Sequence, residues 1–151
     1  MRILYHDLVR KGEEVERGVG TVFYAELDGV LGDADCVVVA TPLVGRTLLA
    51  EERFVRFKRG GHFANSARGL LGDDEASVQT LDDGRPAGKG MDVHANEPYV
   101  HPRLAIHPKV MMMSHNAGST VDTHIGFEGF LHKGRALTLV NAHLIKPQRT
   151  L

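Results

Sequence analysis

The sequence lacks several features that would each indicate a class of protein. It has one cysteine in 151 residues, which excludes an internal disulfide and favours a compartment that keeps thiols reduced. No apolar run is long enough to cross a bilayer, and the apolar stretch after Met1 and Arg2 is too short for a signal peptide. We therefore expect a cytoplasmic protein that makes no contact with a membrane.

An excess of charge of one sign is also absent. The chain has 18 Lys and Arg residues against 19 Asp and Glu residues, a net charge of −1, so nothing indicates a nucleic acid as partner. Its nine histidines show no metal-ligand spacing, and we assign no metal site. A small molecule is the expected partner, and the length suits one domain with its own core.

Short apolar runs alternate with longer amphipathic segments, a pattern typical of βα units around a parallel sheet. The predicted strands are 2–6, 21–24, 36–40, 62–65, 88–93 and 110–114. The predicted helices are 27–31, 48–57, 74–81 and a longer one over much of 122–140, and the proline-containing segment 98–108 is expected to be irregular. The apolar runs predict buried side chains for Cys36 and for Met111, Met112 and Met113.

Three charged or titratable residues, Arg68, Glu97 and His115, each come just after a predicted strand. Ligands of open α/β sheets bind outside the carboxyl ends of the strands, so we expect these side chains to share one place. Arg68 suits a carboxylate, His115 is a proton donor near neutral pH, and Glu97 would keep the imidazole charged and oriented. The set predicts a site for a small organic acid whose neighbouring carbonyl or hydroxyl exchanges a proton.

Three motifs surround these residues in order: Asn65-Ser66-Ala67-Arg68-Gly69, Gly90-Met91-Asp92-Val93 with Glu97-Pro98, and Ser114-His115-Asn116-Ala117-Gly118. Their order and spacing resemble the nucleotide-binding domain of the D-isomer-specific 2-hydroxyacid dehydrogenases over nearly the whole chain. The stretch Asp92-Val93-His94 and the segment after His115 look most like fungal members acting on bulky or aromatic 2-hydroxy acids, such as D-mandelate dehydrogenase, and like hydroxypyruvate-glyoxylate reductases.

The resemblance implies a Rossmann-like, doubly wound parallel α/β sheet and hydride transfer between nicotinamide and a D-2-hydroxy or 2-keto acid. It makes Arg68, Glu97 and His115 the catalytic residues. Asp7 would bind the ribose hydroxyls, which favours NAD and leaves NADP as the alternative. The resemblance also indicates a homodimer. The cofactor-binding positions that it implies are Asp7, Thr41, Pro42, Asn65, Ala67, Asp92 and Gly118.

The glycine loop Gly-x-Gly-x-x-Gly, which opens a dinucleotide fold, is missing from the sequence. Gly18-Val19-Gly20 runs into Thr21 and a strand, so we interpret it as a turn. Asp7 resembles the acidic residue that ends the second strand of the family's fold, and the chain would then start after the phosphate loop. The fold would be incomplete, with an unpaired edge on strand 2–6 and on strand 36–40.

We therefore expect residues 1–151 to be a partial NAD-binding domain, with the substrate domain essentially absent and the activity of the chain alone weak or lost. A non-catalytic NAD-binding or dimerisation module, like corepressor relatives or a degenerate relic, is the alternative. Lys89 departs from the family pattern as well. A buried ammonium is costly without a partner, so Lys89 suggests relaxed selection or an exposed edge.

Overall fold

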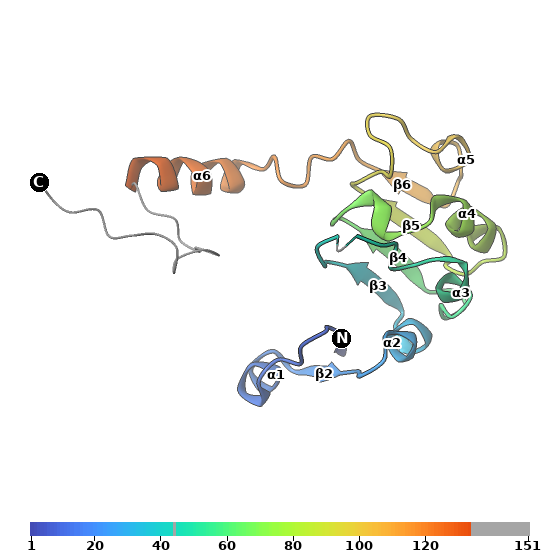
Figure 1. Ribbon diagram of the computed structural model, residues 1–151, viewed down its shortest axis with the longest axis horizontal. Helices are drawn as coiled ribbons and strands as arrows, with labels where there is room; N and C mark the ends of the chain where they lie inside the picture. Colours follow the sequence, from blue (N-terminus) through green and yellow to red (C-terminus); the bar gives the residue numbers. More distant parts are fainter. Residues whose placement is uncertain (44, 134–151) are drawn as a thin grey trace, which may run out of the picture. The chain divides into compact units, whose positions relative to one another are not determined.

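The structure is a computed structural model that describes residues 1–43 and 45–133 (Figure 1). It divides into two compact units, Met1–His115 and a second that starts at Asn116. The described part of the second unit contains helix α6 (Val121–Lys133). This helix lies within the predicted segment 122–140, whose remaining residues are outside the described part of the chain.

The first unit begins with a small parallel sheet. Strand β1 (Ile3–Tyr5) pairs with β2 (Thr21–Phe23), helix α1 (Glu13–Val19) connects them, and α2 (Leu27–Asp33) follows. Gly20 ends α1 with φ 71°, a left-handed conformation that glycine adopts without steric cost, and its N–H donates to the carbonyl of Glu16. The predicted turn before β2 is therefore present, although Gly18 and Val19 belong to the helix that precedes it.

A second parallel sheet has the strand order β3-β4-β5-β6. Its strands are β3 (Cys36–Val39), β4 (His62–Asn65), β5 (Gly88–Met91) and β6 (Val110–Met112). The connections contain α3 (Glu51–Phe54), a 3₁₀ turn (Gly69–Leu71), α4 (Asp74–Asp82) and α5 (Pro102–Ala105). Because consecutive strands are parallel neighbours, the four carboxyl ends share one edge, and the predicted Rossmann-like α/β fold is confirmed.

Both predicted unpaired edges are also present. Within the described residues, β1 pairs only with β2 and β3 pairs only with β4, so each keeps one edge without a strand partner. An edge strand exposes a row of backbone N–H and C=O groups.

The hydrophobic core of the larger sheet lies on the face where Figure 1 shows α3, α4 and α5. Val37 and Val39 of β3 point into it beside the packed rings of Phe54, Phe57 and Phe63, whose centroids are 5.6–5.8 Å apart. A second cluster joins α4, β5 and α5 through Val78, Leu81, Met91 and Leu104.

The expected burial of Cys36 and of two methionines is wrong. Cys36 is exposed, Met111 is 74% exposed and Met113 is 48% exposed. Side chains of a strand alternate between the two faces of a sheet, and these residues lie on the face opposite the core clusters. Met112 lies between these two methionines in sequence, so its side chain points to the other face and packs against the second cluster. An apolar run does not reveal that only one of its faces is covered.

The helix predictions were less accurate than those of the strands. The expected helix 48–57 is shortened to α3, because Leu49 instead forms a bridge with Gly72. Segment 98–108 is not wholly irregular, since Pro102 opens the short helix α5. A proline is tolerated there, because an N–H in the first turn of a helix has no partner within the helix. Helix α1 was not predicted. Helix α4 does start after Asp73, whose carboxylate accepts the N–H of Ala76 at 3.0 Å.

Lys89 does not mark an exposed edge. Its side chain points from β5 toward α4 and the residue is 3% exposed. The Nζ atom donates to Ser77 Oγ at 2.7 Å and lies 3.2 Å from Asp74 Oδ1, above the ring of Phe63. The ammonium therefore has the partner that its burial requires.

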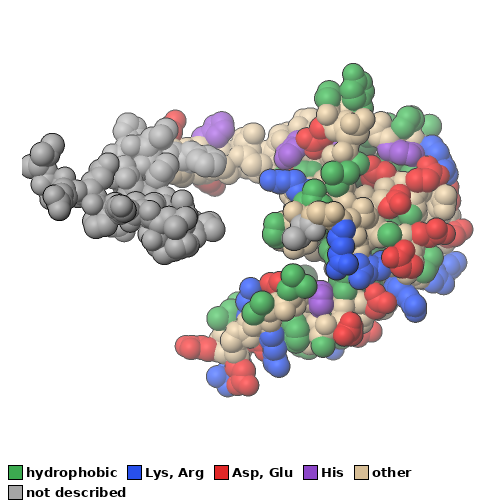
Figure 2. All heavy atoms as spheres, in the orientation of Figure 1, with side chains coloured by type: hydrophobic (Ala, Val, Ile, Leu, Met, Phe, Trp, Pro, Cys, Tyr) green, Lys and Arg blue, Asp and Glu red, His purple; other side chains and the backbone are tan. Residues whose placement is uncertain are grey.

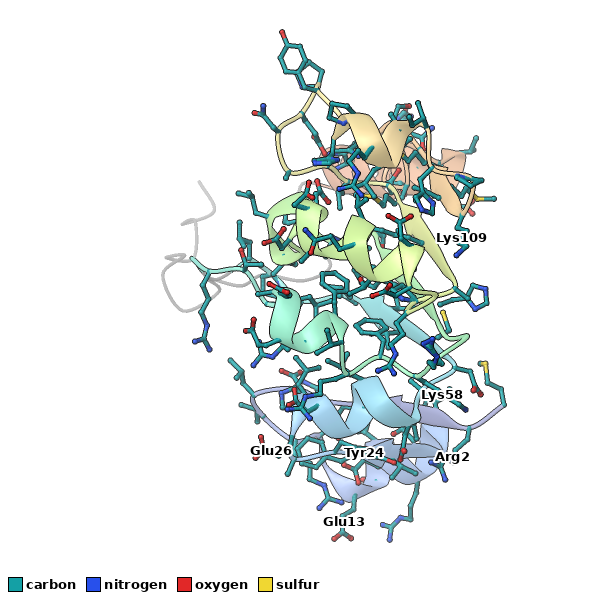
Figure 3. All side chains as sticks on the ribbon, turned by 90° about the vertical axis from the view of Figure 1, so that its right-hand side faces the viewer. Arg2, Glu13, Tyr24, Glu26, Lys58 and Lys109 are labelled. Atoms are coloured by element: carbon teal, nitrogen blue, oxygen red, sulfur yellow. The ribbon has the colours of Figure 1, made fainter. Side chains whose placement is uncertain are left out.

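Acidic and basic side chains are interspersed over the helical side of the molecule (Figure 2). Arg103 of α5 bridges Glu75 and Asp82 of α4 at 2.7 and 3.2 Å. At the amino-terminal edge of the larger sheet, Lys58 contacts Asp35 at 2.6 Å and Lys109 donates to the carbonyl of Leu81 (Figure 3). No helix among residues 1–43 and 45–133 is long and apolar enough to span a membrane.

Lys89 gives a prediction for the pH dependence of stability. Burial lowers the pKa of Lys89, and Asp74 opposes that shift. Between the lowered pKa and the ordinary value of 10.5, the folded chain binds fewer protons here than the unfolded chain, so its stability rises with pH. We expect the urea midpoint of the wild type to increase relative to Lys89→Met between neutral pH and about pH 10. Lys58→Met controls for the loss of a surface lysine, and a wild-type-to-Lys89→Met difference that is independent of pH would contradict the prediction.

Candidate active site

The predicted site residues of the larger sheet follow consecutive strands. Thr41-Pro42 comes after β3, Arg68 after β4, Asp92 and Glu97 after β5, and His115 after β6. Since these strands are parallel neighbours, all of these segments leave the same edge of the sheet. The structure therefore brings the segments of Arg68, Glu97 and His115 together, as the sequence predicts.

Glu97 and His115 are in direct contact. Nδ1 of His115 lies 2.9 Å from Oε1 and 2.8 Å from Oε2 of Glu97, and both side chains are partly exposed. The carboxylate oxygens only accept, so Nδ1 carries a proton, and Nε2 is the ring nitrogen that does not contact Glu97. The hydrogen bond from His115, together with the N–H of His94, lowers the pKa of Glu97, which is ionised at neutral pH.

The backbone of His115 has an uncommon conformation. Its φ is 54°, and among the described residues other than glycine it alone has a positive φ. This left-handed conformation costs a residue with a Cβ atom about 1–2 kcal/mol. Such residues persist where surrounding contacts fix them, and they are frequent at active sites.

Asn65 shapes the loop that carries Arg68. Its buried amide accepts the N–H of Ala67 at 3.1 Å and donates to the carbonyl of Arg68 at 2.9 Å. The Arg68 side chain is exposed, and its Nη1 donates to the carbonyl of Ala67 at 2.6 Å. No carboxylate of the described residues forms an ion pair with Arg68, so its guanidinium can pair with a carboxylate ligand.

Gly69 joins this loop to the loop of Glu97. A Cβ atom at Gly69 would lie 2.0 Å from the carbonyl carbon of His94 and 2.1 Å from its oxygen, distances that no side chain can occupy. The two backbones therefore approach so closely that only glycine fits. Sequence reasoning missed this contact, although a glycine directly after Arg68 was a signal for it.

His94 is a second residue that sequence reasoning missed. Its N–H donates to Glu97 Oε1 at 2.9 Å, and its ring Nε2 lies 2.9 Å from the carbonyl oxygen of Met113. It therefore touches the segments that follow β5 and β6. Its position three residues before Glu97 was the available signal.

Asp7 follows β1, in the smaller sheet. Its carboxylate accepts the N–H of Leu8 at 2.7 Å and lies 3.1 Å from Lys11 Nζ. Lys11 and then the Leu8 N–H lower the pKa of Asp7. Arg10 is held by Glu16 at 2.8 Å. A partly exposed, ionised acceptor after a strand suits hydroxyl donors such as those of a ribose, so the residues present fit that part of a dinucleotide.

The remaining predicted positions divide between the two units. Asp92 is buried, and its N–H donates to the carbonyl of Asn65 at 3.0 Å. Gly118 belongs to the second unit. Within the described part of the chain, no three His, Cys, Asp or Glu side chains are grouped as a metal site requires.

Comparison with known proteins identifies the family. Residues 1–117 match the profile of the D-isomer specific 2-hydroxyacid dehydrogenase, NAD binding domain. The chain belongs to this family. The NAD-binding domain and the family resemblance predicted from the three motifs are thereby confirmed, whereas the roles of individual site residues stay predictions.

Individual known proteins match over most of this chain. It is 33% identical over 150 residues to 4-methyl-2-oxopentanoate reductase A of Aspergillus oryzae, covering 93% of this chain and 45% of that protein. It is 35% identical over 156 residues to glyoxylate reductase of Pyrococcus horikoshii, covering 97% of this chain and 46% of that one. The apo structure of Rhodotorula graminis D-mandelate dehydrogenase matches with a TM-score of 0.82 and 29% identity, covering 86% of this chain and 38% of that one. The chain thus spans less than half the length of each of these relatives.

Gly69 supplies a prediction for the site. Gly69→Ala would force a Cβ atom into the main chain of His94, so we expect a loss of stability of at least about 1–3 kcal/mol. Gly18→Ala is the matched control, because a Cβ there meets nothing within 4 Å and alanine favours the helix. Urea unfolding of both variants checks this, and equal midpoints for the two variants would show that the two loops are not in contact.

Proposed function

We propose that this chain provides the NAD-binding and proton-transferring part of a D-2-hydroxyacid dehydrogenase that interconverts a small 2-hydroxy acid and its 2-keto acid. The observation that carries the proposal is the contact of both Glu97 carboxylate oxygens with Nδ1 of His115, at the sheet edge that also carries Arg68. Family membership supports it.

Arg68 would bind the carboxylate of the acid. Its guanidinium is permanently charged, planar and without a carboxylate partner in the described residues, and a carboxylate accepts two parallel hydrogen bonds from such a group. This contact fixes the neighbouring C2 atom and its oxygen relative to His115.

His115 would exchange the proton. In reduction, Nε2 gives its proton to the C2 oxygen as the carbonyl becomes a hydroxyl, and in oxidation Nε2 removes that proton. Glu97 holds the Nδ1 proton and opposes the positive charge on the ring. NAD, when bound, supplies or accepts the hydride.

Asp7 would select the cofactor. Its ionised carboxylate accepts hydrogen bonds from ribose hydroxyls and repels a 2′-phosphate, which favours NAD over NADP. Thr41, Pro42, Asn65, Ala67 and Asp92 are proposed to line the same cofactor.

We further propose that residues 1–151 act as a partial NAD-binding domain whose turnover by itself is weak. Residues 1–151 hold no Gly-x-Gly-x-x-Gly between a strand and a helix, so they do not themselves supply the usual backbone donors to the pyrophosphate. A homodimer and a cytoplasmic location are part of the same proposal.

NADH oxidation by the purified chain with a panel of 2-keto acids tests the reaction. We expect a weak rate that His115→Ala lowers about 100-fold or more, because general acid catalysis contributes at least that factor. Arg68→Gln should mainly raise KM for the keto acid. His62→Ala, an exposed histidine at the amino-terminal edge of the sheet, is the control. A rate unchanged in His115→Ala would contradict the mechanism, and NADH binding without turnover would favour the non-catalytic module.

Titration with NADH and NADPH tests Asp7. We expect Asp7→Asn to bind NADH more weakly and to lose its preference over NADPH, since the substitution removes the negative charge that a 2′-phosphate would meet. Asp83→Asn, after α4, is the matched control. An unchanged ratio of the two affinities in Asp7→Asn would assign cofactor selection to other residues.

A further inference from the structure

We propose that His94 is a positioning residue that holds the Glu97–His115 pair in its reactive arrangement. Its importance for turnover rests on the function proposed above. The contacts that carry the proposal lie wholly within the unit Met1–His115 and involve the segments after β4, β5 and β6.

The main chain of His94 is fixed on both sides. Its N–H donates to Glu97 Oε1 at 2.9 Å, the same oxygen that His115 Nδ1 approaches to 2.9 Å. Its carbonyl packs against Gly69, where a Cβ atom would overlap it. The position of His94 therefore sets where the carboxylate of Glu97 lies relative to the Arg68 loop.

The ring of His94 links the β5 segment to the β6 segment. Nε2 lies 2.9 Å from the carbonyl oxygen of Met113, whose N–H donates to the carbonyl of Met91 at 2.8 Å. A carbonyl oxygen only accepts, so the proton of the His94 ring must be on Nε2. Met113 is thus held through both its N–H and its C=O, two residues before His115.

The other ring nitrogen supports the same tautomer. Nδ1 of His94 is buried and has no hydrogen-bond partner among the described residues. In the neutral Nε2–H form, Nδ1 carries only a lone pair, and the one N–H of the ring is satisfied by Met113.

His115 needs such support because its φ of 54° is unfavourable. Loss of the His94 ring donor frees the Met113 carbonyl and loosens the backbone that leads to His115. The guanidinium of Arg68, which would bind the carboxylate of the keto acid, is on another loop. A change at residue 94 should therefore lower kcat while leaving KM for the keto acid nearly unchanged.

Long-range ¹H–¹⁵N spectra of the histidine-labelled 151-residue chain test the positioning without any requirement for turnover. In the wild type we expect the Nε2–H tautomer for His94 and the Nδ1–H tautomer for His115. His94→Phe removes the donor and should alter the His115 ring signals, whereas His94→Gln, whose amide can donate to the same carbonyl, should restore them. His62→Phe at the opposite edge of the sheet is the matched control and should leave them unchanged.

An Nδ1–H tautomer for His94 in the wild type, or unchanged His115 signals in a folded His94→Phe chain, would overturn the proposal. If His94→Phe does not fold, the proposal is decided by the wild-type tautomer of His94 and by whether the His115 signals of His94→Gln match those of the wild type.

Turnover separates the positioning role from the proposed reaction. If the wild type turns over, His94→Phe should lower kcat roughly tenfold to a hundredfold with rescue by His94→Gln, as expected for a small misplacement of a reacting group. A rise in KM alone would overturn the role of His94. The expected spectral changes in a chain without turnover would support the positioning and count against the reaction.

Discussion

The close approach of Gly69 to the main chain of His94 is the constraint on which the site depends. Parallel strands bring three segments to one edge of the sheet, but their loops could leave that edge in many directions. The missing side chain at Gly69 lets the Arg68 loop lie directly on the segment that positions Glu97. Asn65 then holds the loop of Arg68, because its amide accepts the N–H of Ala67 and donates to the carbonyl of Arg68. Arg68 and the Glu97–His115 pair thereby lie at one edge of the sheet.

The charged side chains of the interior and those of the candidate site differ in their exposure to solvent. Lys89 is buried, paired with Asp74 and Ser77, and ties β5 to α4 at the core. Arg68, Glu97 and His115 are partly or fully exposed at the sheet edge, where a ligand can reach them. Asn65, which orders the loop of Arg68, is buried. This division agrees with a site whose chemistry occurs at exposed groups held by a rigid framework.

The family relationship and the local geometry are separate lines of evidence that agree with each other. Residues 1–117 establish the NAD-binding domain of 2-hydroxyacid dehydrogenases, while the chain spans less than half the length of the relatives described here. The substrate is therefore inferred from chemistry. We propose a small organic acid, because Arg68 offers a permanent cation to a carboxylate and Glu97 orients the imidazole of His115.

The sequence by itself determined the strands, the parallel fold and the sheet edge at which Arg68, Glu97 and His115 lie, because apolar periodicity and ordered motifs are local properties. It did not determine which face of the sheet is covered, so Cys36, Met111 and Met113 were wrongly expected to be buried. The partner of Lys89, the contact at Gly69 and the ring of His94 on Met113 join residues distant in sequence. Only the tertiary structure decided these contacts, because they depend on how separate loops and helices pack in space.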